Sequence, residues 1–505
     1  MTHSVQVQDR QKTTKSGRLI EEAQGYVTLM RDLAKSSGIY ALSSLAAPII
    51  ALVLAPFLTH SLSTTDYGAL VVLNTAILLI TGITQLGLIS AVFRAYNYDY
   101  ESRTDRRKVL STTIVLLSIT SIPLTVVFLL VAPWLAGVLL GHASFSDAIK
   151  VAAVVMLIQN FSVPGLAWLR AEGRATFFSV VSIVNLLVAL GATVVFVGPL
   201  HMGIVGALLA IGVGYACIVV CTLPLIISSA GVSYRADIVR NLVSFGVPLV
   251  FNTLSFWVLQ LSDRYLLSRL GSLSQTASYG VAYSLGGALN VVVLAPFTLA
   301  WPTAMFAIAK REDAPQAFQV VFRWFGILLL AAAFVLSLIA VALLNILFPV
   351  AYHASAPIIP IIAVSIVFYG IYSIFTVGTG IKRKTWYIAL VMTIAAVINV
   401  AANFVLIPLY GSMGAALSTL IAYIILTIIM YFVNQRIYPL PFEVGLFTIA
   451  LLIGFIFYAG SSLLVRNQAV YGTCAIYIVA TILYFGCLVL LGWGAGKYPG
   501  LLRRA

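Results

Sequence analysis

Charged side chains are scarce in this sequence. Asp, Glu, Lys and Arg make up only 9% of its 505 residues and apolar residues make up 61%, whereas a soluble domain carries roughly 25% charged residues. The four cysteines and five histidines show no metal-binding pattern: Cys217 and Cys221 lie one helical turn apart, but no histidine or carboxylate shares their apolar stretch. The composition excludes an ordinary soluble fold. It predicts an all-α polytopic membrane protein without a metal site or cofactor.

The sequence also lacks the features of an ATPase or a membrane enzyme. No GxxxxGK[ST] phosphate-binding loop occurs. The segments expected outside the membrane are short, the longest covering residues 132–148, and they offer only Asp66 and Asp147 as nearby carboxylates, far apart in sequence. An enzyme that joins or transfers lipid-linked sugars needs acid–base groups or a metal there. These absences favour a transporter or channel over a sugar polymerase or ligase.

Long apolar stretches are what the sequence has in abundance. Fourteen of them can cross a bilayer, and they run over residues 37–59, 67–93, 109–131, 149–169, 176–198, 204–226, 242–268, 278–308, 322–348, 357–380, 386–408, 413–435, 442–464 and 470–494. With the N-terminus inside, only Lys150, Arg264, Arg269 and Arg466 of the 29 basic residues fall outside. We therefore expect both termini in the cytoplasm. The net charge of +14 then indicates contact with anionic inner-leaflet lipids and not with nucleic acid.

A weak internal repeat divides the chain. The segment LSTTDYG at residues 62–68 returns as LSQTASYG at residues 273–280, and the turn PLHMG at residues 199–203 returns as PLYG at residues 408–411. Because each copy holds an even number of spans, the halves share one orientation, as in transporters whose substrate site lies between two parallel repeats. We predict a cytoplasmic tail at 1–36, homologous six-span lobes at 37–240 and 241–440, and spans thirteen and fourteen with a cytoplasmic tail at 441–505.

Charged residues inside spans are functional candidates, because a charge in the bilayer is costly. Asp263 is the one carboxylate expected well within a span, beside Arg264 near the outer end of span seven. It either faces a cavity, where it can bind a proton or a cation, or neutralises Arg264 at the membrane surface. Arg94 and Arg170 end spans two and four on the cytoplasmic side. Each of these two arginines is either a membrane anchor or an anion-binding group.

Amide side chains also recur within the spans, where hydrogen bonding between helices is their simplest role. Those near prolines inside the spans are the better candidates for lining a cavity, because a proline frees backbone carbonyl groups. These candidates are Gln159, Asn160, Asn252 and Gln260.

Several short motifs resemble those of bacterial polysaccharide flippases, in the multidrug/oligosaccharidyl-lipid/polysaccharide superfamily. They are LSTTDYG at 62–68, QLGLISAVFR at 85–94, LRAEGRATFF at 169–178, and SFGVPLV with DRYLL in span seven. The resemblance implies twelve core helices in two lobes around a basic cavity. It also implies a function: undecaprenyl-pyrophosphate-linked oligosaccharide units are flipped from the inner to the outer leaflet of the bacterial cytoplasmic membrane, by alternating access, for O-antigen, capsule or exopolysaccharide synthesis. Polymerase and chain-length proteins are the implied partners.

The resemblance turns the polar residues into a predicted site. We expect Arg94, Arg264 and Arg170 to bind the pyrophosphate, Asp263 to couple transport to an ion gradient, and the four amides named above to line the path. One departure from the pattern of related transporters counts against an alternative that stays open. Drug-exporting relatives carry a coupling carboxylate in span one or seven, whereas span one here has none and span seven has only Asp263. The alternative is a cation-coupled antiporter of soluble amphipathic compounds.

Overall fold

The computed structural model describes residues 50–465 and 470–497; within them, the side chains at 248, 249, 251–253, 255, 256, 470, 471 and 494–497 are not described. All regular structure in these residues is helical, which confirms the expected all-α membrane class. A helix is the form in which a single segment satisfies its own backbone hydrogen bonds in hydrocarbon. The expected tail at 1–36 and most of the first span lie outside the described residues.

The long helices follow one another with short connections. After the apolar helix Ile50–Ser61 they are α2 (Thr64–Thr84), α3 (Leu88–Arg94), α4 (Arg103–Leu130), α5 (Ala132–Leu140), α6 (Ser146–Ala171), α7 (Ala175–Val197), α8 (Gly203–Ala230), α9 (Ala236–Leu270), α10 (Leu273–Gly286), α11 (Ala295–Ala309), α12 (Ala314–Leu347), α13 (Ile358–Phe375), α14 (Val377–Ile381), α15 (Trp386–Tyr410), α16 (Ser412–Ile437), α17 (Val444–Val465) and α18 (Val470–Lys497). Four short elements complete the order: the π-helices η1 (Ala95–Asp99) and η3 (Asn290–Leu294) and the 3₁₀-helices η2 (Ala143–Phe145) and η4 (Val350–Ser355).

Most of the expected spans are present as helices. Within the described residues, 12 helical stretches are long and apolar enough to cross a membrane, and they coincide with spans two to six and eight to fourteen. The 35-residue helix α9 occupies the position of the seventh span, and helix Ile50–Ser61 is the described part of the first. The chain is therefore a multi-pass membrane protein.

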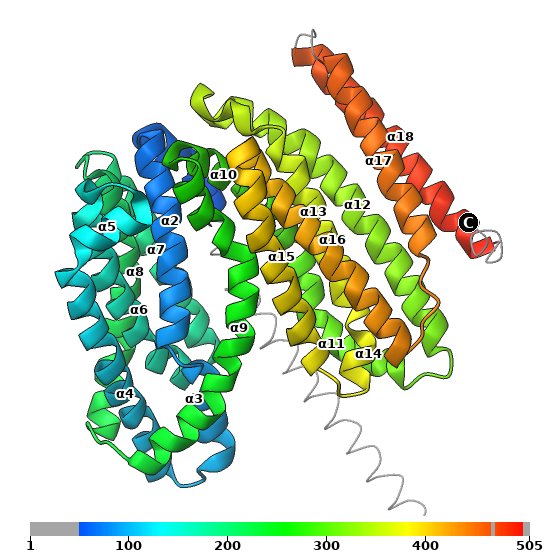
Figure 1. Ribbon diagram of the computed structural model, residues 1–505. Helices are drawn as coiled ribbons and strands as arrows, with labels where there is room; N and C mark the ends of the chain where they lie inside the picture. Colours follow the sequence, from blue (N-terminus) through cyan, green and yellow to red (C-terminus); the bar gives the residue numbers. More distant parts are fainter. Residues whose placement is uncertain (1–49, 466–469, 498–505) are drawn as a thin grey trace, which may run out of the picture.

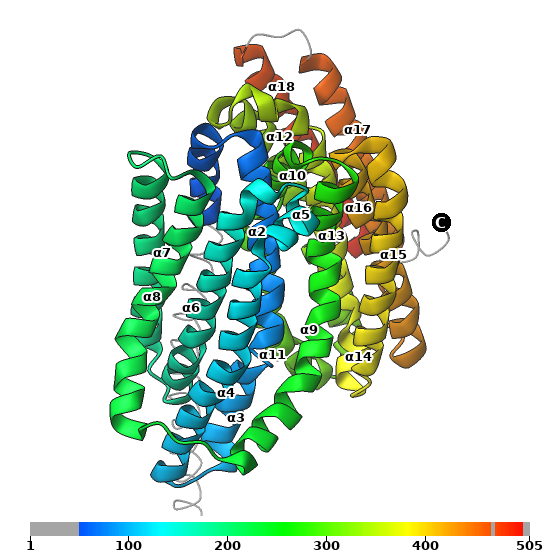
Figure 2. The ribbon, with the colours of Figure 1, turned by 60° about the vertical axis from the view of Figure 1, so that its left-hand side comes forward.

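The helices gather into two bundles (Figure 1). Helices α2–α8 form the N-terminal bundle, and α11–α16 form the C-terminal bundle. Between them, α9 packs against α2 and α3 on one side and against α15 on the other, and α10 packs against both α2 and α13. Figure 2 shows the same arrangement from another side, with α9 running between the bundles. A lobe boundary at residues 240/241 remains a prediction.

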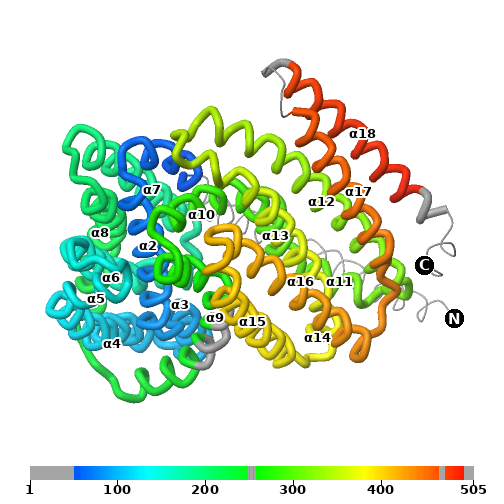
Figure 3. Tube along the Cα trace, turned by 45° about the horizontal axis from the view of Figure 1, so that its top comes forward, coloured from blue at the N-terminus to red at the C-terminus, as the bar shows by residue number. Residues whose placement is uncertain are grey.

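The last two helices form a separate antiparallel pair, α17 and α18, which packs on α12 (Figure 3). An ion pair connects the start of α17 to α12. The Arg323 Nε atom donates to Glu443 Oε2 at 2.6 Å, and Gln319 Nε2 donates to Glu443 Oε1 at 2.6 Å. The Arg323 and Glu443 side chains are only 9% and 12% exposed. Removing either Arg323 or Glu443 would leave the other charge buried and unpaired. This ion pair therefore holds helices α17 and α18 against α12.

Three expected spans, the second, the eighth and the tenth, are not continuous helices; the tenth is interrupted at Thr376, between α13 and α14. Between α2 and α3 the backbone turns through Leu86 and Gly87, whose φ angles are 49° and 65°. Glycine tolerates such angles, and the turn allows close packing: a Cβ atom on Gly87 would lie 2.5 Å from the Gly246 carbonyl oxygen of α9. The stretch from α10 to α11 is likewise interrupted by η3. Apolar content alone predicts none of these interruptions, and the one at Gly87 depends on the neighbouring helix α9.

The repeated motif marks the start of a helix in both halves. Ser63 accepts a hydrogen bond from the backbone N–H of Asp66 at the start of α2, and Ser272 accepts one from that of Gln275 at the start of α10. Such serine caps satisfy amide groups that have no partner within the helix. Ser63 belongs to the repeated motif and Ser272 lies one position before it, so both copies begin a helix but the two caps are not equivalent positions.

Candidate functional site

Two of the predicted arginines lie in one pocket. Arg94 ends α3 and Arg170 lies in the last turn of α6, and both line a cavity of about 640 Å³. We call it the Arg94 pocket; its lining residues are Ile89, Ser90, Phe93, Arg94, Asn97, Tyr98, Arg170 and Phe245. Two guanidinium groups in one pocket suit an anion with several acceptor oxygens.

Arg94 is held loosely within this pocket. Its guanidinium lies 4.7 Å from the centre of the Phe245 ring on α9, a cation–π distance. Its Nε atom lies 3.5 Å from Asp99 Oδ1, at the end of η1. The Arg94 side chain is 48% exposed. The Arg170 guanidinium lies 5.9 Å from the Phe178 ring centre. The pocket therefore offers cationic groups that a ligand can reach.

Asp263 lies at the centre of a second group of polar residues, within the membrane-spanning part of α9. It is 1% exposed and accepts hydrogen bonds from the Tyr279 hydroxyl of α10 and, at 3.3 Å, from the Thr419 hydroxyl of α16. The backbone N–H of Arg264 donates to its Oδ1 atom at 2.8 Å. We call this group, with Arg264, Tyr283 and Gln260, the Asp263 cluster. It joins three helices around one carboxyl group.

The Arg264 side chain points away from Asp263. Its Nη1 atom lies 3.5 Å from the Thr75 hydroxyl on α2, and its guanidinium lies 4.7 Å from the centre of the Tyr283 ring. Its Nε atom is buried without a hydrogen-bond partner among the described residues. No Asp263–Arg264 ion pair occurs in the part of the chain described, so the self-neutralised surface pair does not form. Arg264 instead links α9 to the N-terminal bundle.

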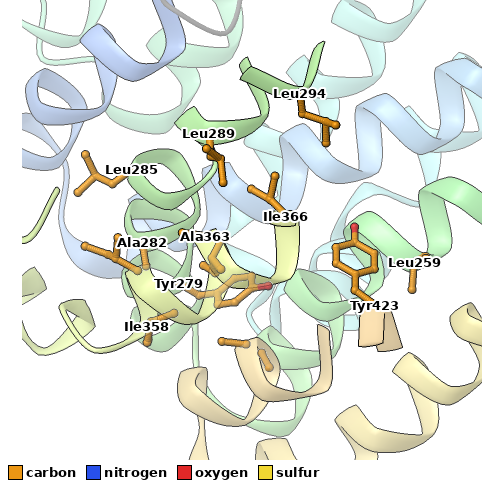
Figure 4. Close-up of a cluster of buried hydrophobic side chains, with 14 of the residues drawn as sticks. Leu259, Tyr279, Ala282, Leu285, Leu289, Leu294, Ile358, Ala363, Ile366 and Tyr423 are labelled. Carbon is orange, nitrogen blue, oxygen red and sulfur yellow. The ribbon is translucent and has the colours of Figure 1, made fainter. Parts of the chain in front are cut away.

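Further polar residues surround the Asp263 cluster, and several were missed by sequence reasoning. Gln260 accepts a hydrogen bond from the Tyr283 hydroxyl at 2.8 Å. Close by on α9, Ser262 donates to Asn399 on α15, which also accepts from Asn403. Figure 4 shows Tyr279 and Tyr423 pointing into a core of aliphatic side chains from α9, α10 and α13. Tyr279 had a signal in the sequence because it belongs to the repeated motif, and Asn399 had one as an amide within a span.

The remaining predicted residues lie elsewhere. Asn160 of α6 donates to the Thr84 and Ser121 hydroxyl groups at 2.9 Å each, and Gln159 donates to the Tyr215 hydroxyl at 3.2 Å. Both amides therefore tie helices together inside the N-terminal bundle, away from the Arg94 pocket and the Asp263 cluster. The side chain of Asn252 lies outside the described residues.

The Tyr-Gly motif meets its repeat where α2 crosses α10. Gly68 lies so close to α10 that an added Cβ atom would fall 1.9 Å from the Leu273 carbonyl oxygen, and one on Gly280 would fall 2.8 Å from a methyl carbon of Val71. Side chains at these glycines would force the helices apart. We call this contact the α2–α10 seam; it closes the space between the bundles beside the Asp263 cluster.

The Arg94 pocket and the Asp263 cluster are well separated. Phe245, which lines the pocket, and Arg264 lie 19 positions apart on the same helix. At 1.5 Å per residue this corresponds to about 28 Å along α9, close to the roughly 30 Å thickness of a bilayer core. The structure thus brings Arg94 and Arg170 together but places Arg264 about 28 Å away along α9.

Comparisons with known proteins concern the family and the fold of the chain. A sequence model for the family described as polysaccharide biosynthesis protein matches residues 33–309. The chain is also 25% identical, over 209 residues, to an uncharacterized membrane protein of Methanocaldococcus jannaschii; the match covers 40% of this chain and 41% of that relative, so it spans less than half of the relative's length.

Solved structures show the same fold at low identity. The lipid II flippase MurJ in an inward closed conformation superposes with a TM-score of 0.71 at 14% identity, over 92% of this chain and 99% of MurJ. A multidrug resistance transporter of the MATE family, in its inward-facing conformation, gives a TM-score of 0.62 at 14% identity, over 78% of this chain and 97% of that transporter. A transporter of the MOP superfamily from Pyrococcus furiosus gives a TM-score of 0.56 at 14% identity, over 80% of this chain and 95% of that transporter.

Proposed function

Because this chain belongs to the family of polysaccharide biosynthesis proteins, we propose that it is a flippase for lipid-linked oligosaccharides. Its substrate is an undecaprenyl-pyrophosphate-linked repeat unit, turned from the inner to the outer leaflet of a bacterial cytoplasmic membrane. The unit then enters O-antigen, capsule or exopolysaccharide synthesis, where polymerase and chain-length proteins receive it. Both termini lie in the cytoplasm, and basic residues on that side contact anionic lipids.

The convergence of Arg94 and Arg170 in one pocket carries this proposal. A pyrophosphate-sugar head cannot cross about 30 Å of hydrocarbon unaided. It first meets the transporter at the inner leaflet, the side on which positive-inside topology puts Arg94 and Arg170. Guanidinium groups bind phosphate oxygens in a two-pronged geometry, and two such groups match a diphosphate. The Arg94 pocket is therefore the loading site.

Arg264 and Gln260 act later in the proposed cycle. They contact the head after the bundles rock apart and the α2–α10 seam opens, which gives alternating access. Asn252, in the same helix, lines the path between the Arg94 pocket and the Asp263 cluster. Gln159 and Asn160 position α6, the helix that carries Arg170, through their contacts with α2, α4 and α8.

Asp263 is the proposed coupling residue. A buried carboxylate that accepts from two hydroxyl groups and a backbone N–H can exchange a proton or a sodium ion when the helices around it move. Because α9, α10 and α16 all contribute to this site, its occupancy would bias how the bundles pack. Ion binding at Asp263 would in this way drive the opening of the α2–α10 seam.

The proposed orientation is tested by site-specific labelling in intact cells. Single cysteines at Asp105, Asp237 and Arg383 should react only after the membrane is permeabilised, whereas cysteines at His142, His201 and His353 should react from outside. A residue labelled on the opposite face would contradict the fourteen-span threading and the inner position of the Arg94 pocket.

The proposed substrate is tested by deleting the gene and isolating the lipid-linked sugars. Oligosaccharide pyrophosphates should accumulate on the inner leaflet, and surface polysaccharide should disappear while the enzymes that build the unit stay active. Re-expression of the wild-type chain should restore surface polysaccharide. Unchanged lipid-linked sugars in the deletion strain would contradict the flippase proposal.

The buried carboxylate at Asp263 also supports a second candidate, a cation-coupled antiporter of soluble amphipathic compounds. The two candidates differ in what the deletion strain loses. An antiporter predicts greater sensitivity to amphipathic cations and an intact surface polysaccharide, whereas the flippase predicts the reverse. Measuring both properties in one strain separates them.

A further inference from the structure

Asp99 is the carboxylate that is paired with Arg94. The pair makes one contact, from Nε of Arg94 to Oδ1 of Asp99 at 3.5 Å, and the Asp99 side chain is 27% exposed. This distance exceeds that of a charge-assisted hydrogen bond, about 2.7–2.9 Å. The other carboxylate near the end of α6, Glu172, is already engaged by Arg174 Nε at 2.7 Å and by the Tyr96 hydroxyl at 2.8 Å.

The π-helix η1 explains how Asp99 reaches Arg94. The two residues are five positions apart, and in an α-helix this spacing puts side chains about 140° apart around the axis. The segment Ala95–Asp99 is instead a π-helix, and the Tyr100 N–H bonds to the Ala95 carbonyl oxygen, five residues earlier, at 3.0 Å. Bonding to the fifth residue brings positions five apart closer to one face. Single π-turns of this kind are rare and are frequent at functional sites.

We propose that Asp99 is an exchangeable counter-ion that sets how tightly Arg94 holds an anionic head group. This inference rests on the proposed function, because it takes the ligand of the Arg94 pocket to be a diphosphate. Asp99 holds the guanidinium over Phe245 while the pocket is empty. A diphosphate, which carries more charge and more acceptor oxygens than a carboxylate, displaces Asp99; when the head moves on, Asp99 returns to Arg94 and assists release.

The arrangement makes Asp99 a positioning residue with a distinctive signature. Asp99→Asn removes a negative charge that competes with the ligand, so it should strengthen binding, whereas damage to the fold would weaken it. A transported ligand must bind well enough to enter and weakly enough to leave. The same variant should therefore transport more slowly once substrate saturates the pocket.

The test uses the full-length protein in detergent, with farnesyl diphosphate and farnesyl monophosphate as probes. Asp99→Asn should bind the diphosphate about threefold to tenfold more tightly than wild type, with a smaller gain for the monophosphate. In cells it should lower surface polysaccharide output despite normal membrane insertion. Asp313→Asn is the matched control: Asp313 pairs with Arg311 at 2.7 Å in another loop, and Arg311 holds the pKa of Asp313 below its usual range, so Asp313 is charged at neutral pH.

A double variant tests whether Asp99 acts through Arg94. Arg94→Ala with Asp99→Asn should bind the diphosphate as weakly as Arg94→Ala alone. Equal or weaker binding by Asp99→Asn, or a gain that persists without Arg94, would overturn the inference. These readings do not depend on the deletion experiment: accumulation of lipid-linked sugars with no tightening by Asp99→Asn removes the counter-ion role alone, and tightening without accumulation removes the proposed substrate alone.

Discussion

Arg94 and Arg264 present the same chemical group in two different settings. Each guanidinium lies 4.7 Å from the centre of an aromatic ring, Phe245 for Arg94 and Tyr283 for Arg264. Arg94 is half exposed, beside a cavity of about 640 Å³ and a carboxylate. Arg264 lies between the bundles, beside the Thr75 hydroxyl and with its Nε atom enclosed.

This difference concerns access and not charge. Arg94 is exposed and Arg264 is only partly exposed; in the proposed cycle a ligand reaches Arg264 once the α2–α10 seam gives way. With about 28 Å of α9 between them, the two arginines cannot hold one pyrophosphate at the same time. In a flippase they would serve opposite ends of the cycle, Arg94 at loading and Arg264 at release.

Replacing Arg94 should have the largest effect on function. A charge-assisted hydrogen bond in a partly dehydrated pocket contributes roughly 1.5–3 kcal/mol, so Arg94→Ala should weaken diphosphate binding by a factor on the order of 10–100. Arg94→Lys keeps the charge but loses the planar fork and should retain partial activity. The measurements are probe binding in detergent and surface polysaccharide output in cells.

Arg103→Ala is the matched control for Arg94, because Arg103 is an exposed basic residue at the start of α4 on the same expected side. It should insert, bind and transport normally. A fully active, normally inserted Arg94→Ala protein would make Arg94 a membrane anchor and remove one half of the comparison.

Adding a side chain at the α2–α10 seam tests the other half of the comparison, the access to Arg264. A Cβ atom on Gly68 would fall 1.9 Å from a backbone oxygen of α10, whereas one on Gly191 in α7 has nothing within 4 Å. Gly68→Ala should therefore prevent tight closure and reduce polysaccharide output on the order of tenfold, while Gly191→Ala should not. A cysteine at Ala76, in a chain without the native cysteines, should react more rapidly from outside when Gly68 is replaced. Equal reactivity in both variants would mean that the seam does not control access.

Asp263→Asn tests whether the buried carboxyl group couples transport to an ion gradient. The amide has nearly the same shape and can still accept from Tyr279 and Thr419, so the fold should be retained. The flipping rate of this variant in vesicles should then no longer respond to an imposed proton or sodium gradient. With the gradient present, the variant should flip several-fold more slowly than the wild type. Asp147→Asn, at an exposed residue paired with Lys150, is the control. A fully active Asp263→Asn protein would remove carboxylate coupling in span seven and point to downhill flipping drawn by polymerisation outside.

The membrane class and most of the helices were predictable from sequence, because hydrocarbon leaves a single segment few alternatives to a helix. The interruptions in spans two, eight and ten were not. The turn at Gly87 exists because Gly246 of α9 packs against it, and a contact of that kind follows from tertiary packing and not from the local apolar pattern.

The site was predictable in part, for a similar reason. The expected topology put Arg94 and Arg170 on one side of the membrane, but their convergence depends on how α3 packs against α6. Asp263 stood out as a carboxylate within a span, yet its hydroxyl partners lie 16 and 156 residues away in sequence. No spacing rule reaches that far. The repeat did predict that residues 62–68 and 273–280 were equivalent, although not that they touch.

The smallest effects are expected for variants of Tyr283, which contacts Arg264 through its ring and Gln260 through its hydroxyl group. Tyr283→Phe keeps the ring beside Arg264 and loses only the 2.8 Å hydrogen bond to Gln260, a contribution of about 0.5–1.5 kcal/mol. Tyr283→Leu also loses the cation–π contact, worth roughly 0.5–2 kcal/mol. Polysaccharide output should therefore fall by at most a few fold in Tyr283→Phe and should fall further in Tyr283→Leu, to the level of Arg264→Ala.

All three variants should bind the diphosphate probe as wild type does, because the Arg94 pocket is untouched. Weakened probe binding in Arg264→Ala would instead mean that both arginines contact one ligand in one state, and the division between loading and release would be wrong.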